Sequence, residues 1–246
     1  MKLNTDGLII REQQTGDYDR LVTILTRDYG VIRAFANGAK RIKSRSQSAT
    51  QLFAYGNFSI YRGRDAYSID EAQPREIFFG LRSNIEYISL AQYICELAGE
   101  TAPIEEAADD YLRLTLNALH MLAEQKRPPL QIKAIFELRV MCLSGYMPEL
   151  TVCADCGRED SAEHYFSPVE GVTVCGDCMG DHTCIRLSDG ELAAMRHICY
   201  SDERRLFSFR LSDDSLERLS DITEEYVEAQ TGKKLRTLEF YKTMRG

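Results

Sequence analysis

Residues 153–178 read CADCGREDSAEHYFSPVEGVTVCGDC, and this stretch holds two pairs of cysteines with two residues inside each pair. Cys153 and Cys156 form the first pair, and Cys175 and Cys178 form the second after eighteen intervening residues. A separation of two residues lets both thiolates of a pair reach one tetrahedral ion at about 2.3 Å. The whole spacing is typical of a four-thiolate zinc site. We therefore expect a small module in which the chain returns as a hairpin, with Gly171 near its tip.

This donor set predicts a structural ion, one Zn²⁺, because four thiolates close the coordination shell. A catalytic zinc keeps one position for water and commonly uses histidine or carboxylate ligands. His164, His182 and Cys184 lie nearby in the sequence and are interpreted as surface or neighbouring residues. An iron–sulfur cluster also takes four cysteines, although usually at tighter spacings. Three further cysteines lie on apolar helical stripes and are expected in the core: Cys95, Cys142 and Cys199.

The module is embedded in a chain of 246 residues, which is long enough for more than one domain. The hydrophobic share of 44% and the charged share of 28% are ordinary for a globular protein. No apolar run approaches the ~20 residues that cross a bilayer. The first residues lack the apolar core of a secretory signal. We expect a cytoplasmic protein without membrane contact, in which a reducing environment favours metal binding or burial of cysteines over disulfides.

Residues 1–80 are predicted to form a small closed β-barrel, because short apolar or alternating runs are separated by turn signals and no helix intervenes. The rest of the chain is predicted to be helical, so the fold class is α+β. The predicted domains are 1–80 for the barrel and 81–246 for the helical part, with the zinc module at 151–185. The expected strands are 3–10, 20–26, 31–37, 53–61 and 66–72.

Start and stop signals mark the helices of the second domain. Ser83 with Glu86 is predicted to form a capping box, and Ser188 with Glu191 another. A second helix is expected over 107–123, and a third starts at Pro128-Pro129 and ends at Gly145. Residues 206–211 are interpreted as a short strand. Ser212 is expected to open a last long helix, and Gly232 stands where a glycine ends a helix.

A basic segment follows the third expected strand. Lys40, Arg41, Lys43 and Arg45 place four positive charges within six residues, and Arg33 precedes them on the strand. Residues 1–80 carry twelve Lys/Arg against nine Asp/Glu, a net charge of +3; because the whole chain carries −8, the remainder carries −11. A flexible basic loop on a small barrel suits a phosphate backbone, although a solvated loop that keeps a barrel soluble is the alternative.

Aromatic residues accompany this segment. Some must fill the barrel, and any on its open face could stack on bases. The candidates are Tyr18, Phe35, Phe53, Tyr55, Phe58, Tyr61 and Tyr67. Sequence motifs for enzymes are absent: there is no nucleotide-binding G-x-x-x-x-G-K-[ST], no H-E-x-x-H and no G-x-S-x-G. The pattern of a zinc deaminase is also missing. We therefore expect a protein that is not an enzyme.

Several motifs in their order resemble the RecO family of bacterial recombination mediators, in its zinc-bearing branch. The most telling stretch is GAKRIKS at 38–44, close to the family's basic signature. Asn37 stands where lysine is commoner, Thr237 where serine is usual, and Asp17 where glutamate is usual. The other matching stretches are GLII at 7–10, GD at 16–17, LT at 25–26, YG at 29–30, FELR at 136–139, SGY at 144–146, the two cysteine pairs and GKKLRT at 232–237.

The resemblance implies an N-terminal OB-fold, a helical domain and a zinc module. It also implies binding of single- and double-stranded DNA, annealing of complementary strands, and a role in DNA repair and recombination in the RecF pathway. RecR would be a partner, the acidic tail of single-stranded DNA-binding protein another, and RecA would be loaded indirectly. The DNA-binding candidates are Arg33, Lys40, Arg41, Lys43 and Arg45, and those for an acidic tail are Arg113, Lys126, Arg127, Lys133 and Arg139.

Two other functional classes compete with this reading. A sequence-specific zinc-ribbon regulator would need base-reading side chains near the cysteines. Residues 153–184 instead contain one Arg and no Lys against seven Asp/Glu, which disfavours contact with DNA. An assembly scaffold that touches only protein and has no annealing activity is the remaining alternative.

Overall fold

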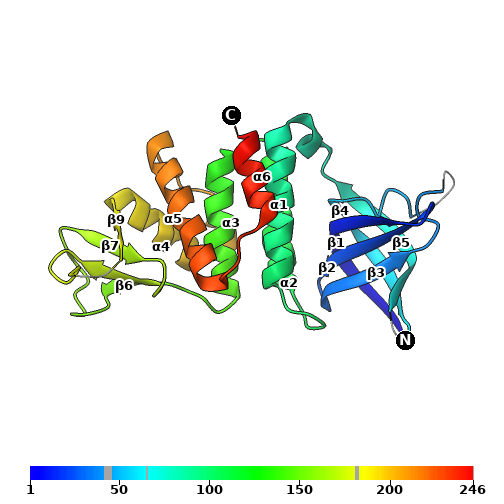
Figure 1. Ribbon diagram of the computed structural model, residues 1–246, viewed down its shortest axis with the longest axis horizontal. Helices are drawn as coiled ribbons and strands as arrows, with labels where there is room; N and C mark the ends of the chain where they lie inside the picture. The colour runs from blue at the N-terminus through cyan, green and yellow to red at the C-terminus, as the bar shows by residue number, and fades with distance from the viewer. Residues whose placement is uncertain (42–45, 65, 181–182, 246) are drawn as a thin grey trace. The chain divides into compact units, whose positions relative to one another are not determined.

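The computed structural model describes residues 1–41, 46–64, 66–180 and 183–245. The chain divides into two compact units, Met1–Gln125 with Leu235–Gly246, and Lys126–Lys234. Figure 1 labels the helices and strands. Every helix in the described part of the chain is either too short or too polar to span a bilayer. The domain bounds 1–80, 81–246 and 151–185 stay predictions.

The first unit begins with a closed five-stranded barrel, which confirms the predicted OB-fold (Figure 1). Its strands are β1 (Lys2–Thr15), β2 (Asp19–Thr26), β3 (Gly30–Ala36), β4 (Ala54–Arg62) and β5 (Tyr67–Ile77). The order around the barrel is β1-β2-β3-β5-β4, and the antiparallel pairing of β1 with β4 closes it. β3 and β5 pair in parallel, with Phe35 opposite Ser68. The strands β1 and β5 are longer than expected because exposed polar residues continue the backbone pairing beyond the apolar pattern.

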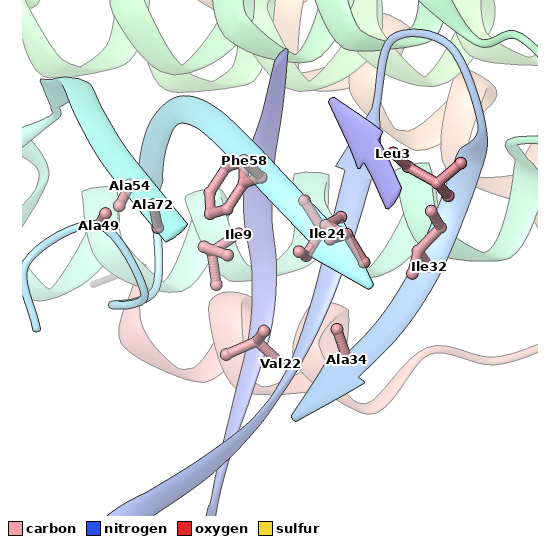
Figure 2. Close-up of a cluster of buried hydrophobic side chains, with 11 residues drawn as sticks. Leu3, Ile9, Val22, Ile24, Ile32, Ala34, Ala49, Ala54, Phe58 and Ala72 are labelled. Atoms are coloured by element: carbon pink, nitrogen blue, oxygen red, sulfur yellow. The ribbon is translucent and has the colours of Figure 1, made fainter. Parts of the chain in front are cut away.

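Alternation along β3 sorts its side chains between the core and the surface. Ile32 and Ala34 point into the barrel and pack with Ile24 and Phe58, as Figure 2 shows. Arg33 and Phe35 lie on the opposite face and are exposed. The apolar residues that make β3 a strand therefore also decide that these two side chains face outward.

Helices complete the first unit: the short 3₁₀ helix η1 (Phe79–Ser83), α1 (Ile85–Thr101), α2 (Asp109–Ala123) and α6 (Arg236–Met244). The predicted capping box of Ser83 and Glu86 is wrong. Asn84 is the N-cap of α1 and accepts a hydrogen bond from the Glu86 N–H, whereas the Ser83 hydroxyl donates to the carbonyl of Gly80. Helix α6 was not expected; it lies beside α1 (Figure 1), and its Thr237 N–H donates to Glu96.

The connection from α1 to α2 is docked on the barrel. The Val31 N–H donates to the Pro103 carbonyl at 2.9 Å, and the Ala108 N–H donates to the Arg27 carbonyl at 2.8 Å. Gly30 has a φ of +59°, and a Cβ there would lie 2.0 Å from the Pro103 oxygen, so only glycine permits this approach. Residues 103–108 are therefore held against the start of β3.

The second unit packs α3 (Pro129–Leu143), α4 (Asp189–Tyr200) and α5 (Asp213–Thr231) beside a four-stranded sheet. The Ser188–Glu191 capping box is confirmed, since both reciprocal hydrogen bonds are present. Gly232 ends α5 with a φ of +66°, as predicted. The sheet has the order β6-β8-β7-β9 and consists of β6 (Glu149–Cys153), β7 (His164–Ser167), β8 (Val172–Cys175) and β9 (Ile185–Leu187).

The expected strand over 206–211 is wrong. This segment follows the short 3₁₀ helix η2 (Glu203–Arg205) and carries no strand in the described chain. Its carbonyls are satisfied by side chains near α3: Arg127 donates to the Phe207 carbonyl at 2.6 Å, and Gln131 donates to the Phe209 carbonyl at 2.9 Å. Leu206 and Phe207 are nevertheless buried. Their burial explains the apolar residues that led to the prediction of a strand.

Candidate functional site

The four cysteines of the two pairs meet in one cluster, as predicted. Their Sγ atoms all lie within 4.8 Å of one another. The Sγ atoms of Cys156 and Cys175 are 3.8 Å apart. A regular tetrahedron with metal–sulfur bonds of about 2.3 Å has edges of about 3.8 Å, so the donor set fits zinc. The cluster could hold a metal ion through four thiolates.

Local folding brings the cysteines together. Cys153 ends β6 and Cys175 ends β8, and these neighbouring strands are parallel. The predicted hairpin is confirmed: β7 pairs antiparallel with β8, and Gly171 turns between them with a φ of +69°. Cys153 and Cys175 are buried, whereas Cys156 is exposed and Cys178 half-buried. One thiolate of each pair therefore faces the core of the module.

Backbone N–H groups prepare a buried sulfur for the thiolate state. The N–H of Cys175 donates to the Sγ of Cys153 at 3.3 Å. Burial raises the pKa of the Cys153 thiol, but the backbone N–H groups of Cys156 and Cys175 outweigh it and lower this pKa to about 6. Thiolates are the form that binds metal.

Arg158 and Asp177 link the turns that carry the two cysteine pairs. The Nη1 atom of Arg158 lies 2.7 Å from the Oδ2 atom of Asp177. The hydrogen bond to Asp177 makes the largest contribution to the raised pKa of Arg158. The negative charges of Asp177, Cys156 and Cys175 raise this pKa further. The guanidinium therefore faces both the partner turn and the negative charge of the thiolates.

Two of the three neighbouring residues, His164 and Cys184, lie within the described chain. His164 lies on β7 outside the cluster, and Cys184 packs partly buried against it without joining the ligand group of the described chain. His182 lies outside the described residues. Among the remaining cysteines, Cys95 and Cys199 are buried, and Cys142 is half-buried with its Sγ 3.7 Å from that of Cys199.

The basic candidates lie on and after β3. Arg33 is exposed on the outer face of the barrel, Lys40 is half-buried and Arg41 is exposed. Neither Arg33 nor Lys40 forms an ion pair with an acid in the part of the chain that the structure describes. Lys43 and Arg45 lie outside the described residues.

The turn that presents Lys40 and Arg41 is fixed to the β1–β2 hairpin. Asp19 accepts the Gly38 N–H at 2.6 Å, and the Lys40 N–H donates to the Tyr18 carbonyl at 3.0 Å. The guanidinium of Arg41 stacks over the Tyr18 ring at 5.6 Å from its centroid. Residues 37–41 are thus held in a defined turn at the end of the barrel.

A groove of about 560 Å³ opens on the barrel beside Arg33. Phe35 and Tyr67 supply rings to its walls, and Arg62 and Glu105 also line it. The sequence had singled out Arg33 as a basic candidate and Phe35 and Tyr67 as candidate base-stacking rings, but it did not point to Arg62 or Glu105. Arg62 follows an apolar strand and carries no local signal, and Glu105 reaches the groove from the distant connection between α1 and α2.

The structure also sorts the aromatic candidates. Phe53 and Phe58 are buried in the barrel. Tyr18, Phe35 and Tyr61 are exposed, and Tyr55 and Tyr67 are half-buried. Phe35 is the exposed ring that lines the groove next to Arg33.

Among the basic residues of the helical part, Lys133 is unsuited to bind a partner. It is 1% exposed, and its Nζ atom lies 2.9 Å from the Oε1 atom of Glu137 and 3.1 Å from the Oε2 atom of Glu224. Arg139 donates to the carbonyl of Cys199 at 2.7 Å, and Arg113 pairs with Asp110. Helical periodicity did not reveal that Lys133 faces α5.

The barrel and the four-thiolate module define an OB-fold protein with a candidate structural metal centre. Residues 1–78 match the model of the family "Recombination protein O N terminal", and residues 82–239 match "Recombination protein O C terminal". The chain belongs to the RecO family, which supports a role in DNA repair.

Relatives named "DNA repair protein RecO" resemble the chain along nearly its whole length. The relative from Acetivibrio thermocellus is 32% identical over 243 residues, covering 98% of this chain and 97% of the relative. The relative from Symbiobacterium thermophilum is 32% identical over 246 residues, with the same coverage. A relative from Dehalococcoides mccartyi is 32% identical over 216 residues, covering 87% of this chain and 85% of the relative.

Proposed function

We propose that this protein is a DNA-binding mediator of homologous recombination in the RecF pathway, which holds single- and double-stranded DNA and anneals complementary strands. The observation that carries the proposal is the outer face of β3. Arg33 has no acidic partner in the described chain and lies beside the exposed Phe35, and the strand leads directly into Lys40 and Arg41. Cations without partners and an exposed ring are what a flexible nucleic acid strand needs.

Annealing requires no bond chemistry, so electrostatic binding is a sufficient mechanism and no catalytic residue is assigned. Arg33, Lys40, Arg41, Lys43 and Arg45 bind phosphates and release counterions. Phe35 stacks on a base at the groove. A protein that holds strands by their backbones leaves the base edges free to pair.

We further propose the partners that the family resemblance implies. RecR joins the chain to help load RecA on DNA that is covered by single-stranded DNA-binding protein, at the nucleoid. An acidic tail of the latter protein would contact Arg113, Lys126, Arg127 or Arg139, because Lys133 is buried among acids of its own unit.

The zinc ion belongs to this proposal as a structural group. Cys153, Cys156, Cys175 and Cys178 hold it, and it supplies a cross-link between the two cysteine turns. The thiolate spacing of 3.8 Å between Cys156 and Cys175 supports zinc over a larger cluster. The excess of acidic residues in the module supports DNA binding on the barrel instead.

An annealing assay with short complementary oligonucleotides across a salt series tests the function. The variant Lys40→Ala/Arg41→Ala should anneal more slowly and bind single strands less tightly, with a salt slope shallower by about 1.4, which corresponds to two phosphate contacts. Arg204→Ala/Arg210→Ala is the matched control, because it removes the same charge from exposed positions of the second unit.

Each outcome of this assay separates the candidates. Annealing without nucleotide that depends on Lys40 and Arg41 supports the mediator. Tight binding to one duplex sequence only would support a zinc-ribbon regulator, and no binding of DNA would support an assembly scaffold. Equal loss in the control variant would remove the basic turn from the mechanism.

A further inference from the structure

The groove beside Arg33 already contains an anion that belongs to the chain itself. The carboxylate of Glu105 accepts hydrogen bonds from the Nη2 atom of Arg62 at 3.1 Å to each oxygen. The hydroxyl of Tyr67 donates to the same carboxylate at 2.6 Å. One guanidinium and one phenol thus converge on a single oxyanion, an arrangement that also suits a phosphate.

The donors are prearranged by a contact that does not involve Glu105. The guanidinium of Arg62 lies over the ring of Tyr67, 5.5 Å from its centroid. Arg62 ends β4, Tyr67 begins β5, and the two residues are paired across the strands. The two donors therefore stay together when the carboxylate leaves.

Glu105 does not belong to the barrel, because it lies in the connection between α1 and α2, and its backbone is in a strained conformation. Backbone hydrogen bonds hold this connection against Val31 of β3 and against Arg27, and the φ of Glu105 is +60°. A glutamate in the left-handed region is strained and persists only where the surroundings hold it there. Hydrogen bonding from Tyr67 and the charge of Arg62 lower the pKa of Glu105, which keeps the carboxylate ionised.

The contact is also weak enough to be exchanged. Arg62 and Glu105 keep 50% and 48% of their side-chain surface exposed, so water screens their attraction. Arg33 lines the same groove without an acidic partner in the described chain, and Phe35 offers a ring. A strand entering this groove would meet the exposed cations Arg33 and Arg64, the ring of Phe35, and the pair of donors that Glu105 occupies.

We propose that Glu105 occupies the place of a backbone phosphate of single-stranded DNA, and that a phosphate displaces it from Arg62 and Tyr67 when the strand binds. This inference rests on the proposed DNA-binding function and adds a residue that opposes it. Glu105 weakens binding, so that the chain holds single strands loosely enough to release them when they have paired.

The test compares binding of a short thymidine homopolymer by Glu105→Gln and Glu106→Gln. Glu106 is the matched control, because it is exposed in the same connection and does not line the groove. Glu105→Gln should bind about threefold to fivefold more tightly than Glu106→Gln, which is the effect of removing one exposed competing ion pair. The salt slope should become steeper by up to about 0.7.

A second pair of variants traces the gain to Arg62. In an Arg62→Gln background, the difference between Glu105→Gln and Glu106→Gln should vanish, because the donor is gone. Glu105→Asn provides a second replacement suited to the left-handed backbone, since asparagine adopts this region readily. It should also bind more tightly than Glu106→Gln and unfold at the same or a higher temperature.

The possible outcomes distinguish a failure of this inference from a failure of the proposed function. If the unchanged protein binds no single strand, the proposed function fails. If it binds, but Glu105→Gln and Glu105→Asn bind no more tightly than Glu106→Gln, the displacement is wrong while the function stands. A gain that persists without Arg62 would equally overturn the assigned phosphate position.

Discussion

Arg158 and Asp177 form an ion pair of 2.7 Å that joins the two cysteine turns at the surface of the candidate metal centre. The two side chains are 53% and 75% exposed, so water screens the pair and it adds little to stability by itself. The ion pair matters more for the metal site, because Arg158 lies close enough to Cys156 and Cys175 to interact with their negative charges. If the four thiolates bind one Zn²⁺, the guanidinium would offset part of the net negative charge of that group.

We expect Arg158→Ala to lower zinc affinity about tenfold, as loss of a neighbouring group that supports ligands commonly does. Competition with a chromogenic chelator measures this affinity. Arg186→Ala is the control, because Arg186 forms an ion pair of the same length with Glu163 in the same module. Equal effects of the two replacements would mean that general charge, and not contact with the cysteine turns, sets the affinity.

Cys153→Ser should destabilise the second unit by at least about 2 kcal/mol, because it removes a buried ligand and binding of a structural zinc is folding free energy. Zinc content and thermal unfolding measure the loss, and binding of DNA by the folded variant should change little. Cys184→Ser is the control beside the cluster. A stable Cys153 variant that had lost DNA binding would place the module in the binding site.

Lys133→Met should lower the free energy of unfolding by about 3 kcal/mol or more, because it leaves the buried charge of Glu137 without its cation. Thr223 donates to Glu137 at 2.6 Å and would remain as its partner. Denaturation by urea measures the change. Lys234→Met, whose side chain is 80% exposed, should change stability by less than about 0.5 kcal/mol. A mild effect at Lys133 would show that water replaces the lost ammonium.

Phe35→Ala should weaken binding of a thymidine homopolymer by at least about fivefold, because stacking on one base contributes roughly 1–3 kcal/mol. The salt slope should not change, since no phosphate contact is lost. Arg33→Ala should instead make the slope shallower by about 0.7. Tyr61→Ala serves as the control, because Tyr61 is 54% exposed on the barrel but does not line the groove. Fluorescence anisotropy at several salt concentrations separates the two effects.

Local patterns were good predictors of single elements. The alternation in residues 31–36 placed a strand, and the serine and glutamate at 188 and 191 placed a helix start that the structure contains. The sequence was less reliable where two neighbouring residues could both cap the same helix. Asn84, and not Ser83, caps α1, because both residue types cap helices and only the path of η1 decides between them.

Two predictions failed because the sequence does not show what buries a segment or a side chain. Leu206 and Phe207 are apolar because they are buried, but side chains from the region of α3 satisfy the backbone that a neighbouring strand would otherwise pair. Lys133 looked available for a partner because its own helix shows Glu137 four residues on but not the cover by Ser220 and Glu224 of α5, which buries the pair. In both cases the deciding group lies far away in the sequence.

The four thiolates were determined by the sequence alone, because the ligand geometry of each pair depends on two intervening residues. The basic segment after β3 was equally visible. Tertiary structure alone brought Glu105 to Arg62, 43 residues apart, through a connection docked on Gly30 and Val31. Closure of the barrel also decided that Phe35 faces a groove while Phe58 fills the core. Such contacts depend on the docking of whole elements, which no local pattern specifies.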